Sequence, residues 1–268
     1  MFRLYKGAWI DDNPPHLAEK KDKQECSHLL EQGGYLVRST YDFDTPGPTS
    51  FWFVIKDSFG GFEELTPKMR NQVRKSLKTY DARMVSRKEV AEYGLRIYNS
   101  AIKGYNPQAQ LLTQPQIEGL LSEQIDDDNK KYEYWMVFER ETEKAVAIAI
   151  NILKPDCCEY SAMKCDTDYM HNSSYPYYGL IYEMNRHYLE DSCLRYVYDG
   201  SRSITEHSDI QSFLIKKFNF RKAYCNLQVE YKWWLSMAVK VLYPFRKILP
   251  SKKAQSLLRM EAMCRNEY

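Results

Sequence analysis

The sequence predicts a mixed α/β fold in which helices flank a central, largely antiparallel sheet, with two amphipathic helices at the C-terminal end. The apolar runs 132–139 and 145–153 are joined by the short polar segment 140–144, a pattern typical of a β-hairpin. The segment 195–224 then alternates between strand-like aromatic and β-branched runs and a helix-like run. Alternation of this kind favours a sheet with helices packed on its faces.

Each element is predicted from its own periodicity and from the residues at its ends. Thr66 and Pro67 fit an N-cap and a first helical position, and the nearly all-apolar run 145–153 fits a central strand covered on both faces. Residues 167–175 are expected to form a polar loop. The predicted helices are 17–32, one beginning at Pro67, 89–103, 116–125, 176–190, 233–247 and 252–265. The predicted strands, besides the hairpin, are 35–40, 51–56, 82–85, 158–163, 196–198 and 222–231.

A tight corner is predicted at the end of strand 196–198. The segment 199–201 (Asp-Gly-Ser) has turn chemistry, and its glycine is free to take a positive φ. Ser203 with Glu206 three residues later fits a capping box, while Ser208 is a second candidate N-cap. The start of the helix that follows therefore has two alternatives, one turn apart.

Charge is unevenly distributed along the chain. The 268 residues carry a net charge of +2, yet eight basic residues stand against two acidic ones from Lys232 onward. A basic tail suggests an acidic partner such as lipid head groups, nucleic acid or an acidic protein, and a solvated helix is the other interpretation. The helix beginning at Pro67 carries a second basic face, which could hold a phosphorylated or otherwise anionic substrate or could simply be solvated.

The composition argues against several classes of protein. The seven cysteines are scattered without a CxxC spacing, which disfavours a disulfide framework and favours a reducing compartment. No spacing of His, Cys, Asp and Glu indicates a metal site. The N-terminal residues lack the apolar core of a signal peptide, and the interrupted apolar run 233–245 is shorter than the roughly 20 residues that span a bilayer. We therefore expect a cytoplasmic protein.

Three segments in the second half of the chain share a pattern of residue types: 176–189 (PYYGLIYEMNRHYL), 196–201 (YVYDGS) and 213–220 (FLIKKFNF). In this order they resemble the acyltransferases of the GNAT superfamily, in particular its Fem-like branch. The basic helix over 69–78 also resembles the Arg-rich helix that precedes the core in that branch. The chain differs from the pattern in having one glycine, Gly200, where two are common, and Asn219 in place of Gly. Residues 172–179 lack the glycine-containing loop that binds coenzyme A in the superfamily.

The resemblance implies a GNAT-like acyltransferase core over about residues 66–231. Residues 1–65 would then complete the same sheet or form a reduced companion domain, and 232–268 would be a basic helical extension. The implied reaction moves an acyl or aminoacyl group from acyl-CoA or aminoacyl-tRNA to an amine acceptor, which would be a small molecule or a peptide.

Candidate catalytic residues follow from the needs of acyl transfer to an amine. A base must take the ammonium proton, donors must meet the developing oxyanion, and an acid can protonate the leaving group. Asp199, at the end of a predicted strand, is expected to act as the base or to bind the substrate ammonium, and an Asx turn is its other interpretation. Glu206 is a second candidate base or a cap residue, and Tyr198 is a candidate acid.

The loop that enters the next helix is expected to bind an anion, namely the phosphates of acyl-CoA. It offers backbone N–H groups, the hydroxyls of Ser201 and Ser203, and the Arg202 guanidinium. Tyr178 and Gly179, near the start of helix 176–190, complete this predicted binding site. The other interpretation is a well-capped helix with a solvated arginine.

A second class of function also fits the sequence. A protein with this fold could lack the chemistry and act as a binding or scaffolding protein that docks its basic C-terminal helices on an acidic partner or a membrane. Residues 233–253 would then make a peripheral membrane contact, with Trp233 and Trp234 at the interface.

Overall fold

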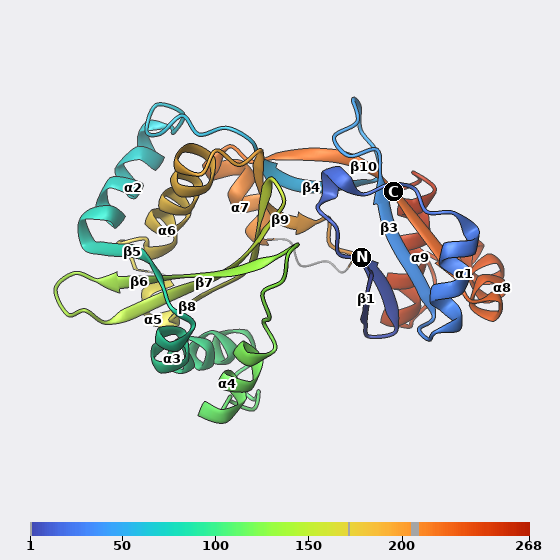
Figure 1. Ribbon diagram of the computed structural model, residues 1–268, viewed down its shortest axis with the longest axis horizontal. Coiled ribbons are helices and arrows are strands. Elements are labelled where there is room, and N and C mark those ends of the chain that lie inside the picture. The colour runs from blue at the N-terminus through green and yellow to red at the C-terminus, as the bar shows by residue number, and fades with distance from the viewer. Residues whose placement is uncertain (1, 171, 205–208) are drawn as a thin grey trace. The chain divides into compact units, whose positions relative to one another are not determined.

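The computed structural model describes residues 2–170, 172–204 and 209–268 of the chain. Its contacts divide the chain into two compact units (Figure 1). Unit 1 contains Met1–Val54, Ser201–Ser212 and Arg221–Tyr268, and unit 2 contains Ile55–Gly200 and Phe213–Phe220. Each unit therefore combines segments that lie far apart in the sequence.

Unit 1 is built on strands from both ends of the chain. β1 and β2 are antiparallel, β2 and β3 are parallel, and β3 pairs antiparallel with β10, which has β4 on its other side. The strands are β1 (Phe2–Tyr5), β2 (Ala8–Asp11), β3 (Leu36–Tyr41), β4 (Phe51–Lys56, its last two residues in unit 2) and β10 (Arg221–Tyr231). The helices are η1 (Pro15–Leu17), α1 (Lys23–Glu31), α8 (Trp233–Leu242), η3 (Tyr243–Phe245) and α9 (Lys252–Cys264).

Helices cover both faces of the unit 1 strands. Alternate residues of a strand point to opposite faces, so Leu227 and Val229 of β10 pack against Met260 and Met263 of α9. On the other face, the Gln228 amide accepts from Lys21 N–H at 2.9 Å just before α1. The core of unit 1 thus depends on β10.

Unit 2 holds the predicted apolar hairpin. Its strands lie in the order β9-β8-β7-β6-β5, antiparallel except for the parallel pair β8 and β9. These strands are β5 (Tyr80–Val85), β6 (Lys131–Glu139), β7 (Ala145–Lys154), β8 (Cys157–Cys165) and β9 (Tyr196–Ser201). The helices are α2 (Pro67–Thr79), α3 (Arg87–Tyr105), α4 (Gln114–Ser122), α5 (Thr167–Met170), α6 (Pro176–Asn185) with the π-helical turn η2 (Arg186–Asp191), and the second half of α7 (Asp209–Phe218).

The strands of unit 2 are covered on both faces, as Figure 1 shows for α3 and α4 on one side and α2 and α6 on the other. Val90, Ile97 and Ile117 of α3 and α4 pack against Met136 and Ile148 of the hairpin. Because β7 is buried from Ala145 to Asn151, it is the central strand that its apolar run predicted.

The structure confirms the predicted mixed α/β class, the hairpin and two backbone features. Gly200 has φ +72° and Asn219 has φ +55°, as a left-handed corner and a left-handed helix end require. Two predictions were wrong at the N-terminal end. β1 and β2 were missed, and the helix expected over 17–32 starts only at Lys23, because the Asp22 side chain caps it by accepting from Glu25 N–H at 2.7 Å.

Two further predictions in the second half needed correction. The loop expected over 167–175 contains the short helix α5, which starts directly after Asp166. The helix expected over 176–190 changes at Arg186 into the π-helical turn η2. Among the described residues, no helix combines the length and the apolarity needed to cross a bilayer.

The contact between α2 and α6 depends on the absence of a side chain at Gly179. Its N–H donates to Ser76 Oγ at 3.0 Å, and both residues are buried. A Cβ at this position would lie 2.6 Å from Ser76 Oγ and 3.3 Å from Ser76 Cβ, both closer than ordinary contact.

We predict that Gly179→Ala lowers the free energy of unfolding by about 1–3 kcal/mol through overpacking, measured by denaturant titration. Gly119→Ala on α4 is the matched control, because nothing lies within 4 Å of a Cβ there. That variant should be neutral or more stable by up to ~1 kcal/mol, the gain in helix propensity. Equal effects of the two substitutions would show that the α2–α6 contact tolerates a methyl group.

Candidate functional site

The predicted site residues divide between the two units at the corner formed by Gly200. Those in unit 2 are Tyr178, Gly179, Tyr198 and Asp199. Those in unit 1 are Ser201, Arg202 and Ser203. Glu206 lies outside the described residues.

Strands β8 and β9 of unit 2 pair over a short distance only. Their parallel register joins Cys157, Cys158 and Glu159 to Tyr196, Val197 and Tyr198, and both strands continue beyond it. Directly after Glu159 and Tyr160, β8 has a bulge at Ser161, where its register with β7 shifts. Beyond this point β8 keeps β7 as its neighbour on one edge. β-Bulges are over-represented next to active sites.

Asp199 is the first residue of β9 past its last pair with β8. The carboxyl is partly buried, and this desolvation, with the negative charge of Glu159 adding to it, raises the pKa of Asp199 from 3.8 to about 7. A carboxyl with that pKa exists in both protonation states at neutral pH, which suits a general base or acid.

Tyr198 contacts the ion pair that Glu159 of β8 forms with Lys154 of β7. Its hydroxyl donates to Glu159 Oε2 at 2.9 Å, and Lys154 Nζ lies 3.0 Å from the same oxygen. Burial and the charge of Glu159 raise the pKa of the Tyr198 hydroxyl well above its ordinary value. Tyr198 therefore holds its proton firmly, and its hydroxyl is directed at Glu159.

A buried polar cluster on the α6 side of β7 was not predicted. The Tyr188 hydroxyl accepts from Trp135 Nε1 at 3.1 Å and from Asn151 Nδ2 at 3.2 Å, and it donates to Glu133 Oε2 at 2.9 Å. Nearby, the Tyr160 hydroxyl donates to Asn185 Oδ1 at 2.8 Å. The only sequence signal was Asn151 itself, a polar residue within the apolar run 145–153.

The start of α6 is held mainly by contacts within unit 2. Ser174 N–H donates to Asn172 Oδ1 at 3.0 Å, Tyr178 N–H donates to Tyr175 O at 3.0 Å, and Gly179 N–H donates to Ser76. The Tyr178 ring lies 5.2 Å from Phe213 and 5.9 Å from Phe218, between centroids. These three amides therefore already have protein acceptors.

Arg202 is enclosed by aromatic rings of unit 1. Its guanidinium carbon lies 4.2 Å from the centroid of Trp52 and 4.5 Å from that of Tyr268, and Nη1 donates to Ser50 O at 2.7 Å. Its backbone N–H donates to Trp52 O at 2.7 Å, and Ser201 O accepts from Gln211 Nε2 at 3.0 Å. Sequence reasoning identified the arginine but not these partners, which lie far away in the chain.

The basic face predicted on α2 is exposed. Its solvent-facing cations are Lys68, Arg74, Lys75 and Lys78. Arg70 instead turns inward, where Nε donates to Phe62 O at 3.1 Å. This face belongs to unit 2, as Asp199 does.

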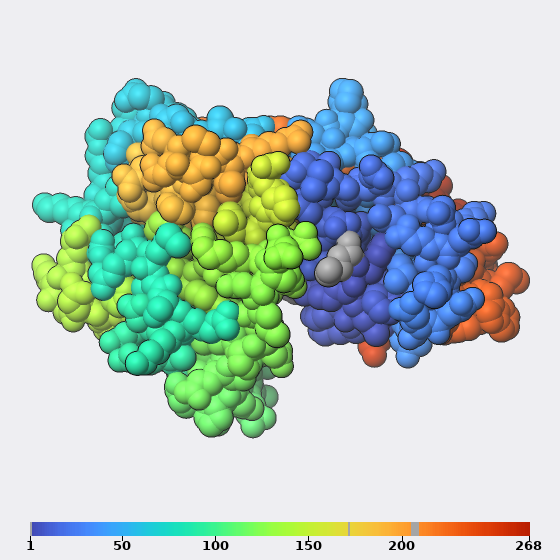
Figure 2. Space-filling model, viewed as in Figure 1, coloured from blue at the N-terminus to red at the C-terminus, as the bar shows by residue number. Residues whose placement is uncertain are grey.

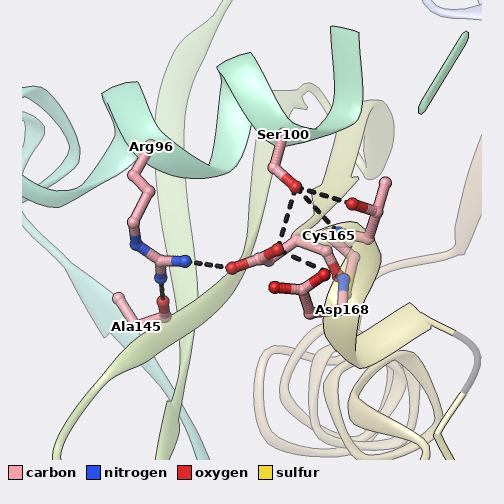
Figure 3. Close-up of polar contacts among 7 residues, drawn as sticks. Arg96, Ser100, Ala145, Cys165 and Asp168 are labelled. Atoms are coloured by element: carbon pink, nitrogen blue, oxygen red, sulfur yellow. Dashed lines mark hydrogen bonds and ion pairs between the residues drawn. The ribbon is translucent and has the colours of Figure 1, made fainter. Parts of the chain in front are cut away.

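Asp166 follows Cys165, the last residue of β8, and Figure 3 shows Arg96 and Ser100 of α3 directed toward this end of the strand. Its carboxylate accepts from the Arg96 guanidinium and from Ser100 Oγ, the latter at 2.8 Å, while Arg96 also donates to Ala145 O. Burial by itself would raise the pKa of Asp166, but the hydrogen bonds from Ser100 and from Asp168 N–H and the charge of Arg96 lower it below its ordinary value. Within the described ranges, no group of three or more His, Cys, Asp or Glu side chains could hold a metal ion.

No protein-family model matches the sequence, and a search of curated proteins finds no match. Solved structures, in contrast, show the fold: the chain has a GNAT-like fold. This confirms the GNAT-like fold that the segments between 176 and 220 resemble, while the Fem-like branch stays a prediction.

Two structures carry this likeness. L-PGS from Bacillus licheniformis is similar over 98% of this chain and 85% of its own, with a TM-score of 0.53 and 13% identity. The C-terminal domain of an Agrobacterium fabrum protein assigned as a lysylphosphatidylglycerol synthetase is similar over 90% of this chain and 84% of its own, with a TM-score of 0.51 and 11% identity. FemX is matched at a TM-score of 0.48 and 10% identity over 67% of this chain, which covers 60% of FemX, less than two thirds of its length. At these identities the likeness shows the fold alone.

We predict that Asp166→Asn lowers the free energy of unfolding at neutral pH by about 1.5–3 kcal/mol, because it weakens hydrogen bonds to a charged acceptor. The pKa of Asp166 is lower in the folded protein than in the unfolded chain. Its stabilisation is therefore present above the ordinary carboxyl pKa of about 4 and is lost as pH falls through the folded value. Urea titrations across acid pH should show a shallower loss of stability in the variant.

Asp168→Asn is the matched control for this prediction, because the Asp168 side chain is exposed. It should change the free energy of unfolding by no more than about 0.5 kcal/mol. A wild-type-like stability of Asp166→Asn at every pH would rule out the proposed role of this carboxylate.

Proposed function

We propose that this protein transfers an acyl or aminoacyl group from an ester or thioester donor to an amine acceptor, where β9 parts from β8 in unit 2. The position of Asp199 carries the proposal. It follows the last β8–β9 pair, and its pKa of about 7 suits proton transfer at neutral pH.

The proposed step is direct transfer. The free amine attacks the carbonyl carbon of the donor, so that a C–N bond forms and the C–S bond of a thioester or the C–O bond of an ester breaks. The Asp199 carboxylate accepts the proton that the attacking nitrogen loses, and the protonated carboxyl then returns this proton to the departing sulfur or oxygen. An amine acceptor needs such a base because only its unprotonated form has a free electron pair.

The carbonyl oxygen of the donor binds at the edge of β8 that faces away from β7. After Glu159, β8 has β7 on one edge, and within the described part of unit 2 its register with β9 has ended. Backbone N–H groups over 161–164 that point away from β7 could donate to the oxyanion as it develops. Fixed donors aimed at developing charge are a main source of rate acceleration in acyl transfer.

The aminoacyl ester of tRNA is the favoured donor class. At the start of α6, the amides of Ser174, Tyr178 and Gly179 already have protein acceptors, which leaves fewer donors for the pyrophosphate of coenzyme A. The exposed cations of α2, in the same unit as Asp199, suit the repeated phosphates of a nucleic acid. The name of one similar structure, lysylphosphatidylglycerol synthetase, also denotes attachment of an aminoacyl group. Acyl-CoA stays the alternative donor.

We predict that Asp199→Asn reduces the turnover number by about 10²–10⁴-fold, the usual contribution of general acid–base catalysis. The wild-type rate should rise with pH through about 7 as Asp199 ionises, and the residual rate of the variant should lack this rise. The measurement is product formation from a panel of amines with either charged tRNA or acyl-CoA as donor.

Asp156→Asn is the matched control, because this carboxyl lies in the β7–β8 turn of the same unit and asparagine tolerates its φ of +58°. It should leave the rate and its pH dependence unchanged. The proposal fails if neither donor class yields product, or if Asp199→Asn keeps the wild-type rate and pH profile.

A further inference from the structure

Helix α8 of unit 1 is apolar on both of its faces. Its inner face packs Leu235 and the buried Val239 in a cluster with Leu258 of α9. Its outer face exposes Trp233 to 80% and Val241 to 63%. A surface helix of a globular protein ordinarily has a polar outer face. The outer face of α8 is instead apolar and exposed, which is typical of a surface that binds a partner.

The apolar outer face continues beyond α8. Trp234 is 45% exposed, and its ring centroid lies 6.1 Å from that of Tyr35, which is 56% exposed just before β3. Figure 2 shows α8, in orange-red, at the surface of unit 1 on the right-hand edge of the view. We name this set of exposed side chains the α8 surface: Tyr35, Trp233, Trp234, Met237, Val241, Phe245 and Ile248.

The segment that forms most of the α8 surface carries charge of one sign, and Glu267, which lies outside this segment, is paired with Arg246 at 3.4 Å. Between Glu230 and Glu261 the sequence contains no acidic residue. Lys240 is exposed within α8, one turn from Met237, and the exposed cations that follow are Lys247, Lys252 and Lys253. Lysine can lay its aliphatic stem along an apolar surface while its ammonium reaches an anionic group.

We infer that the α8 surface binds the interface of a lipid bilayer that contains anionic head groups. Two exposed tryptophans and a tyrosine suit the boundary between head groups and acyl chains, because each ring has an apolar body and a polar tip. The single sign of charge matches an anionic lipid surface, and the apolar row at helical spacing matches a helix that lies in the interface plane. This inference does not depend on the proposed transferase activity.

The test is co-sedimentation of the full chain with vesicles of phosphatidylcholine alone or mixed with phosphatidylglycerol, at low and high salt. The wild-type protein should bind the mixed vesicles more tightly, with affinity that falls as salt rises. Lys240→Glu with Lys247→Glu should weaken this binding at least about tenfold, since each base near an anionic surface contributes about fivefold. Trp233→Ser with Met237→Ser should weaken it about tenfold or more by removing buried apolar area.

Matched controls lie in unit 2, where Tyr105 is 86% and Ile125 is 68% exposed. Tyr105→Ser with Ile125→Ser removes exposed apolar groups, and Lys88→Glu with Lys103→Glu makes the same charge change on α3. Both control pairs should bind vesicles as the wild type does.

Two results would overturn the inference. One is equal vesicle binding by the wild type and both α8 variants. The other is absence of vesicle binding together with a dimer in sedimentation velocity that Trp233→Ser with Met237→Ser dissociates, since the α8 surface would then contact a second copy of the chain.

Discussion

The short pairing between β8 and β9 is the constraint on which the candidate site depends. A strand in the middle of a sheet forms hydrogen bonds along both edges. β8 pairs with β7 along its whole length except at the Ser161 bulge, but it pairs with β9 only over Cys157–Glu159. Asp199 directly follows the last β8–β9 pair, and Glu159, a member of that pair, is close enough for its charge to raise the pKa of Asp199. Beyond this point Ser161 is exposed and residues 162–164 are half-buried, so this edge suits a substrate that supplies hydrogen-bond partners to the strand.

The rest of unit 2 holds β8 at both ends. At the first end, Glu159 joins Lys154 and Tyr198, and at the other Asp166 joins Arg96 and Ser100. Between them, the Tyr188 hydroxyl uses both its acceptor and its donor capacity in a buried cluster. Buried polar clusters of this kind fix geometry more than they add stability. Asn151 Oδ1 has no partner among the described residues, a cost of about 1–3 kcal/mol that the surrounding apolar packing offsets.

Local chemistry made most elements predictable. The run 145–153 gave the central strand, Thr66-Pro67 gave the start of α2, and Asn219 gave the end of α7. Non-local pairing was not predictable, because β3 meets β10 across nearly two hundred residues and the two units interleave along the chain. The same limit applied to the site. The position of Asp199 was visible in the sequence, but its raised pKa depends on Glu159, and the surroundings of Arg202 depend on Trp52 and Tyr268.

The central claim is that a donor binds along the free edge of β8, and amide hydrogen exchange tests it most directly. The comparison is between the free protein and the protein with a tRNA that carries a non-reactive, amide-linked aminoacyl group, with an acyl-CoA thioether as the second ligand. With bound ligand, we expect slower exchange at the amides over 161–164 that face away from β7, and unchanged exchange at the buried amides of β7. Protection that appears only outside β8 and β9 with either ligand would contradict it.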